Sequence, residues 1–145
     1  MGFEATASVP LPLRGFAMEA AVQAWDDDLA YLPRRLWDGA LTYHGIFKES
    51  RNLELWGGLG ATSRDPMPIG ILEPGGDPTV PDLIVVPSLE VSSEEWYFHI
   101  QVRIVTLNLF IRWENILGKS DNVDFPDLQQ PRFRTIYGVR WVMSN

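Results

Sequence analysis

The feature that most constrains this chain is a strict alternation of apolar and polar residues over runs of about ten residues. From residue 37 to 48, the odd positions are apolar or glycine, while Asp38, Thr42, His44 and Lys48 fall between them. Side chains alternate between the two faces of a β-strand but repeat every 3.6 residues in a helix. The alternation therefore predicts strands that carry one apolar and one polar face.

The same pattern recurs along most of the chain and predicts an all-β fold, an antiparallel up-and-down meander of about seven long strands. The predicted strands cover residues 2–10, 14–26, 36–48, 52–64, 94–105, 107–116 and 133–143. Residues 16–25 also suit a helix, but Glu19 and Gln23 lie at even spacing, which favours a strand. Most of these strands exceed the five or six residues that are usual in globular sheets.

The predicted connections alternate between short and long. Residues 10–14, 49–52 and 105–106 are short turns, and the last is a turn because the apolar phase changes by one residue there. Residues 26–35, about 63–93 and 117–132 are long loops. The loop at about 63–93 holds six of the eleven prolines, although Leu83–Val91 could pair locally. Short turns at one end and long loops at the other are typical of outer-membrane barrels, as are strands near 9–11 residues long.

Composition excludes several classes of function. The chain carries 12 Lys and Arg against 19 Asp and Glu, a net charge of −7, and its basic residues do not cluster. Phosphate contacts require clustered Lys and Arg, so we expect no nucleic-acid partner. The absence of cysteine removes disulfides and thiolate chemistry. No apolar run is long enough for a membrane-spanning helix, and residues 1–8 do not form a signal peptide.

Alternation alone leaves two interpretations of the apolar faces open. They face lipid in a membrane barrel, or they face the interior of a soluble all-β binding module. The polar faces combine Glu, Gln, Arg and His with Gly and Thr, as a water-filled lumen would. Aromatic residues lie mostly near strand ends, where membrane barrels carry their interface girdles. These aromatic residues are Trp25, Trp37, Tyr43, Trp96, Tyr97, Trp113, Tyr137 and Trp141.

Several short motifs stand in the order and spacing of one known family. They are Gly2-Phe3-Glu4, the turn at 10–15, Leu32-Pro33-Arg34, the run from Arg112 to Lys119 that contains Glu114 and Asn115, and the run from Arg134 to Trp141. In this order they resemble the C-terminal β-barrel segment of a TonB-dependent outer-membrane receptor. The 112–119 run is the closest match, being similar to the family's penultimate strand.

The last strand is also similar to the signal that barrel-assembly machinery reads in this family. Gly138, Trp141 and Met143 occupy the glycine and apolar positions of that signal. The resemblance further implies that Tyr137, Trp113 and Trp96 are aromatic residues at the membrane interface.

The resemblance implies that residues 1–145 are one barrel segment without a plug domain. It implies a place in the bacterial outer membrane and a role in nutrient uptake, such as that of an iron chelate or glycan. The implied partners are the lipid bilayer, the barrel-assembly machinery, and the remainder of the barrel with its plug. The number of predicted strands is odd, whereas bacterial barrels have an even number of strands. We therefore expect the chain to be a fragment of a barrel and Met1 to be an internal or misassigned start. An eighth strand at 83–91 would instead allow a small closed outer-membrane barrel.

No catalytic, cofactor or metal site is expected, and we do not predict an enzyme. His44 and His99 are the available bases, and neither lies near a Gly-x-Ser-x-Gly turn. The Asp26-Asp27-Asp28 run lacks the spaced ligands of a calcium loop. The glycines at 57, 58 and 60 lie within a strand, where they let neighbouring side chains pack. The acids Glu19, Glu54 and Glu114 are predicted to pair with Arg103, Arg112 or Arg140 on the polar faces.

Overall fold

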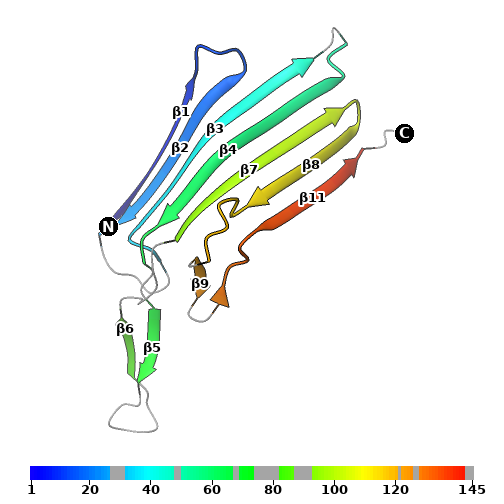
Figure 1. The fold of residues 1–145 in the computed structure, drawn as a ribbon. Helices are drawn as coiled ribbons and strands as arrows, with labels where there is room; N and C mark the ends of the chain where they lie inside the picture. Colours follow the sequence, from blue (N-terminus) through cyan, green and yellow to red (C-terminus); the bar gives the residue numbers. More distant parts are fainter. Residues whose placement is uncertain are drawn as a thin grey trace.

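The chain folds into one large antiparallel sheet of seven strands (Figure 1). The computed structural model describes residues 1–26, 32–47, 50–66, 69–73, 82–86, 93–120, 122–125 and 128–142. The strands of the sheet, in spatial order, are β1 (Gly2–Pro10), β2 (Phe16–Trp25), β3 (Arg35–Phe47), β4 (Leu53–Arg64), β7 (Ser93–Ile104), β8 (Leu107–Glu114) and β11 (Arg134–Trp141). Each strand pairs antiparallel with the strands before and after it in this order, so the sheet is a simple meander.

This architecture confirms the predicted all-β meander of about seven strands. Every predicted strand boundary lies within two residues of the observed one. The segment at 16–25, which also suited a helix, is strand β2. The tight turns of β1–β2, β3–β4 and β7–β8 lie together at one end of the sheet, and the long connections lie at the other (Figure 1).

The change of apolar phase near residue 105 is a two-residue turn, as predicted. Ile104 pairs with Leu107 across it, and Val105 has a φ of 57°. That φ is rare for a β-branched residue. The amide of Val105 donates a hydrogen bond to the carbonyl of Asn52 at 2.9 Å, which ties this turn to the start of the neighbouring strand β4.

Two short hairpins lie within the long connections. Strand β5 (Ile69–Glu73) pairs with β6 (Asp82–Val86), and β9 (Val123–Phe125) pairs with β10 (Leu128–Gln129). The expected local pairing around residues 83–91 therefore occurs at 82–86, in a separate sheet rather than as an eighth strand of the large one. Residues 87–91 lie outside the described residues.

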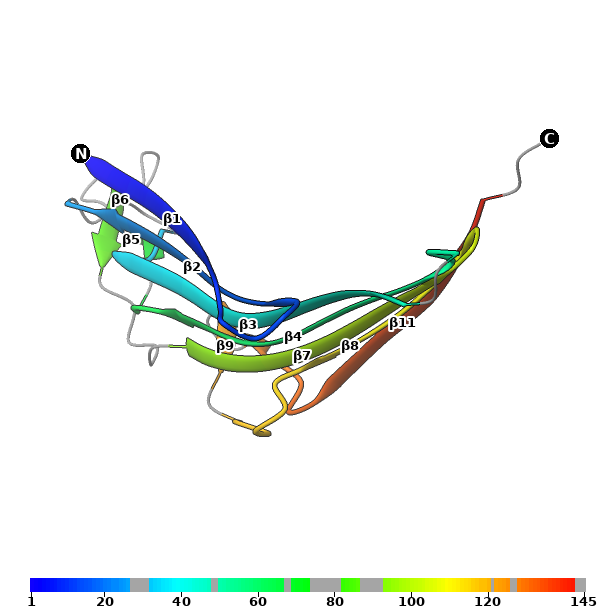
Figure 2. The same cartoon turned by 90° about the horizontal axis from the view of Figure 1, so that it is seen from above.

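The large sheet is a single curved layer (Figure 2). Of the aliphatic and aromatic side chains in the described ranges, Ala61 and Tyr97 alone are buried, and Pro33 is buried beside the long connection before β3. A domain normally buries the apolar face of a sheet against a second layer. The described part of this chain leaves the apolar face of the sheet uncovered.

Candidate functional site

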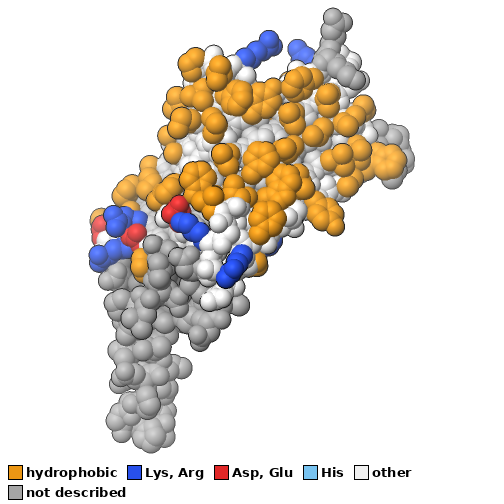
Figure 3. Space-filling model, in the orientation of Figure 1, with side chains coloured by type: hydrophobic (Ala, Val, Ile, Leu, Met, Phe, Trp, Pro, Cys, Tyr) orange, Lys and Arg blue, Asp and Glu red, His pale blue; other side chains and the backbone are white. Residues whose placement is uncertain are grey.

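One face of the sheet is apolar across all seven strands. Residues that pair directly in antiparallel strands share a face, so the register can be followed from edge to edge. One row across the sheet consists of Val9, Met18, Leu41, Leu59, Phe98, Trp113 and Thr135. Figure 3 shows this face, over which apolar side chains extend from one sheet edge to the other.

The apolar face is exposed rather than packed. Met18 is 56% exposed, Leu59 is 41% exposed and Val139 is 67% exposed. Among the strand residues of this face, the charged positions are Arg35 and Glu94, each next to a long connection. Exposed apolar patches larger than a few hundred Å² mark interaction sites with proteins or membranes. The face extends over seven strands and is therefore the candidate functional site.

The apolar face of Figure 3 lies on the outer side of the curve that Figure 2 shows, and the register places the polar residues on the inner side. Near the tight-turn end, the buried Glu54 accepts a hydrogen bond from His44 Nε2 at 2.8 Å and forms an ion pair with Arg103. The rings of His44 and Trp56 stack at 5.1 Å, and Arg103 lies 5.9 Å from the ring of Trp56. The carboxylate of Glu54 is therefore compensated by side chains from both neighbouring strands.

A second network lies towards the long-loop end of the polar face. Glu114 pairs with Arg112 at 2.9 Å and also with Arg134. The guanidinium of Arg112 lies 4.4 Å from the ring of Tyr97, whose hydroxyl donates to Asp38 at 3.2 Å. The predicted pairing is confirmed for Glu54 with Arg103 and for Glu114 with Arg112, whereas Glu19 accepts a hydrogen bond from Thr42. Arg134 is an additional partner of Glu114.

Glycines on the polar face make room for rings on the adjacent strand. Gly58 lies directly opposite His99 and Gly60 opposite Tyr97, and a Cβ at either glycine would overlap the facing ring. Gly138 stands in the same relation to Phe110. The interpretation that glycines 58 and 60 let neighbouring side chains pack is confirmed. In these pairs each ring therefore lies over the backbone of the facing glycine.

The connection between β8 and β11 is fastened to the end of the sheet by two buried asparagines. Asn115, which is 2% exposed, donates from Nδ2 to the carbonyls of Lys119 and Pro131 and accepts from the Lys119 amide. Asn122 accepts from the Glu94 amide at 3.3 Å and donates to the Glu94 carbonyl at 2.9 Å. The Asn122 side chain thus makes the same pair of hydrogen bonds to the β7 backbone that a neighbouring strand would make.

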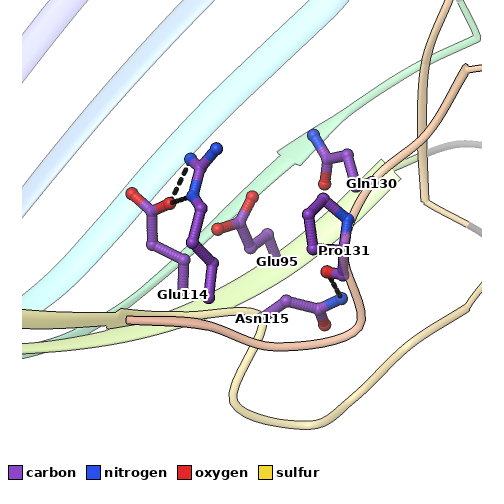
Figure 4. A pocket seen from close by; sticks show the side chains of 6 residues that line it. Glu95, Glu114, Asn115, Gln130 and Pro131 are labelled. Atoms are coloured by element: carbon purple, nitrogen blue, oxygen red, sulfur yellow. Dashed lines mark hydrogen bonds and ion pairs between the residues drawn. The ribbon is translucent and has the colours of Figure 1, made fainter. Parts of the chain in front are cut away.

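A small cavity of about 150 Å³ lies beneath this connection (Figure 4). It is lined by Glu95, Glu114, Asn115, Gln130, Pro131 and Arg134. Burial raises the pKa of Glu95, and the charge of Glu114 adds to that effect. On the other face, a hydrogen bond from Lys119 lowers the pKa of Glu94. The cavity thus holds two acids whose charge Arg134 offsets, and no metal-ligating cluster occurs in the described ranges.

The two edges of the sheet are unpaired in the described part of the chain. Strand β1 pairs only with β2, and β11 pairs only with β8. Because seven strands alternate in direction, β1 and β11 run parallel to each other. Each edge presents a row of backbone donors and acceptors that can template another strand.

The sheet register assigns a face to the residues predicted from sequence. Trp96, Trp113, Tyr137 and Trp141 lie on the apolar face, as does Tyr43, while Gly138 lies on the polar face. Trp25 and Tyr97, which were grouped with the interface aromatics, lie on the polar face. Glu114 and Asn115 are adjacent at the end of β8. Met143 lies outside the described residues.

The structure adds residues that sequence reasoning missed. Arg134, Lys119 and Asn122 join Glu114, Asn115 and Glu94 at the long-loop end. Of the Asp26–Asp28 run, Asp26 lies 3.8 Å from the terminal amine of Met1, and the other two lie outside the described residues. His99 has a buried Nδ1 without a hydrogen-bond partner among the described side chains.

Comparisons of the chain with protein-family models, with curated proteins and with solved structures find no match. The described residues contain no helix with the length and hydrophobicity required to cross a membrane.

Proposed function

We propose that this chain forms part of the wall of an outer-membrane β-barrel, with its apolar face against lipid and its polar face towards a water-filled lumen. The observation that carries the proposal is the apolar face itself, which is continuous over seven strands and uncovered among the described residues. A bilayer covers such a face without any second protein layer. The ion pairs of Glu54 and Glu114 on the other face suit a wet interior.

The lengths of the longest strands fit this role. Strand β3 has 13 residues and β4 has 12, which at about 3.3 Å per residue is roughly 40 Å. Strands of membrane barrels tilt by about 45°, so such strands cover about 28 Å along the membrane normal. The hydrocarbon core of a bilayer is about 30 Å thick. Strands of five or six residues would not cross it.

The open edges indicate the kind of partner that completes the wall. Unpaired backbone groups within lipid cost several kcal/mol each, so a membrane sheet must close. The parallel directions of β1 and β11 prevent antiparallel pairing between them. An odd number of further strands, supplied by the remainder of the barrel, closes the wall with antiparallel pairs throughout, and the barrel-assembly machinery inserts it.

The more specific proposal is a TonB-dependent receptor that takes up a nutrient with the help of a plug. It is supported by the ordered motifs of the sequence. Glu114 and Asn115, which carry the closest motif, anchor the end of β8 and the loop that follows. Gly138 and Trp141, which match the assembly signal, lie on the edge strand β11.

The test uses the protein in the membranes that contain it. The chain lacks cysteine, so Leu41→Cys and Thr42→Cys each introduce one spin label on opposite faces of β3. We expect the label at 41 to be relaxed by oxygen, which concentrates in lipid, and the label at 42 by a water-soluble nickel chelate. An antibody to the chain should detect outer-membrane material of higher mass than this chain alone.

Other outcomes would replace the proposal. A label at 41 that neither reagent reaches, in a soluble protein of the mass of this chain, would indicate a soluble all-β binding module. A heat-modifiable outer-membrane band of the mass of this chain would indicate a small closed barrel and exclude the receptor.

A further inference from the structure

A step in the sheet lies beside the turn that joins β1 and β2. The pairing of β2 with β3 ends at Phe16 and Tyr43, yet β3 continues to Phe47. The last residues of β3 therefore have no β2 neighbour, and a cavity of about 520 Å³ occupies the step. Arg14 lines it together with residues 43–47.

The side chain of Tyr43 joins this step to the apolar face. Its ring packs 4.8 Å from that of Phe16, and its hydroxyl lies over Gly45, where a Cβ would overlap it. The phenol thus points from the apolar face towards the rim, as interfacial tyrosines do. Within the described residues, neither this hydroxyl nor the Arg14 guanidinium has a hydrogen-bond or ion-pair partner.

A second cavity continues from Tyr43 onto the apolar face. Its volume is about 270 Å³, and the backbone of Gly57, which carries no side chain, is part of its lining. In the sheet register Tyr43 and Ile100 lie on either side of Gly57, and both line the cavity together with Phe16. Tyr43 lines both cavities, and we call the two together the track. Its rim is the first cavity, which contains Arg14, and its trough is the apolar second cavity.

The charge of the tight-turn end favours an anion. The charged residues among the described positions of the three tight turns are Arg14 and Arg51, although the whole chain has a net charge of −7. Figure 3 shows basic side chains along the upper edge of the apolar face. At the opposite end, acids such as Asp65 and Glu94 accompany the basic residues.

We propose that this track binds one anionic phospholipid. Arg14 and the Tyr43 hydroxyl donate hydrogen bonds to the lipid phosphate, and one acyl chain lies in the trough over Gly57. Basic residues at a membrane rim bind anionic head groups, and hydrogen bonds that involve charged groups are stronger than neutral ones. The inference rests on the proposed function, since it takes the apolar face to be in contact with lipid.

The test measures binding of phosphatidylglycerol to the detergent-purified assembly that contains this chain, by native mass spectrometry. Arg14→Gln removes the cation and should weaken binding about tenfold. Gly57→Leu fills the trough, where a Cβ has 3.5 Å to its nearest atom, the carbonyl oxygen of His99. This variant should also release the lipid. Arg132→Gln is the matched control, because Arg132 is an exposed arginine at the other end of the sheet.

The outcomes separate this inference from the proposed function. Unchanged binding in both Arg14→Gln and Gly57→Leu would overturn the lipid site, whether or not the spin labels place the face in lipid. Displacement of phosphatidylglycerol by an equal concentration of inorganic phosphate would also overturn it, since it would show a site for the free anion. A protein that proves soluble but binds phosphatidylglycerol through Arg14 would retain the site and lose the barrel.

Discussion

The ring of Tyr97 lies over the bare backbone of Gly60, its directly opposed neighbour on β4. This position lets the Tyr97 hydroxyl reach Asp38 on β3, one strand further away. It also leaves the outer surface of the ring to the guanidinium of Arg112. Because Gly60 has no side chain, Tyr97 can contact both Asp38 on β3 and Arg112 in the network around Glu114.

We predict that Gly60→Ala destabilises the protein by about 2 kcal/mol, since an added methyl group displaces the ring of Tyr97 from a filled position. Gly39→Ala is the matched control on the neighbouring strand. A Cβ there meets nothing closer than 3.8 Å, so we expect a neutral effect or a gain of up to about 1 kcal/mol. Urea unfolding in detergent, followed by tryptophan fluorescence, measures both. Equal stabilities would contradict the packing role of Gly60.

A second prediction concerns Asn115, which has a φ of 50° and three side-chain hydrogen bonds. Asn115→Gly keeps the backbone conformation but removes those bonds, and Asn115→Ala adds strain. We expect losses of about 2–3 kcal/mol for glycine and about 1 kcal/mol more for alanine. Both variants should accelerate proteolysis between residues 115 and 133. If glycine restored full resistance, the hydrogen bonds would not hold this connection.

Sequence patterns predicted the strands and most of their facing residues because alternation reports the face of each side chain directly. Where a tight turn joins two strands, the register follows as well. The turn at residues 105 and 106 places Tyr97 opposite Glu114 and His99 opposite Arg112. Arg112 and Glu114 lie two residues apart on β8 and therefore share a face, so alternation alone made their pairing accessible.

The remaining contacts depend on long connections, which carry no register. Residues 65–92 separate β4 from β7, so the sequence could not place Gly60 opposite Tyr97. Asn122 lies within the connection of residues 115–133 and Arg134 directly follows it, so the sequence could not place either residue. A polar side chain in such a loop shows no periodicity. Its role in fastening the loop to Glu94 or Glu114 appears only in three dimensions.

The adjacent acids Glu94 and Glu95 predict opposite responses to pH, and both precede Trp96, where the apolar band of β7 begins. A hydrogen bond from Lys119 lowers the pKa of Glu94, so the contribution of this carboxylate to stability is present at neutral pH and is lost as the pH falls through that pKa. The pKa of Glu95 is raised by burial, so folding favours its protonated form and stability falls as the pH rises through that pKa.

We therefore expect Glu94→Gln to increase proteolysis of the 115–133 connection at pH 7 and Glu95→Gln to decrease it. Digestion rates measured between pH 3 and pH 7 check both signs. As the pH falls and both carboxyl groups become protonated, the two variants should approach the unmodified protein. A decrease for both variants at pH 7 would show that the Lys119 contact does not hold the connection.

The last prediction distinguishes lipid from a protein core as the environment of the apolar face. Leu53 and Leu59 lie on the same face of β4, near its tight-turn end and near its middle. Arginine at the bilayer midplane costs about 2–4 kcal/mol, and near the interface about 0–1 kcal/mol. We expect Leu59→Arg to show the larger loss in urea unfolding and Leu53→Arg the smaller one, because an arginine at 53 reaches the water nearby. In a close-packed core an unpaired arginine is costly at either position. Equal and large losses at the two leucines would therefore place protein, and not lipid, against this face.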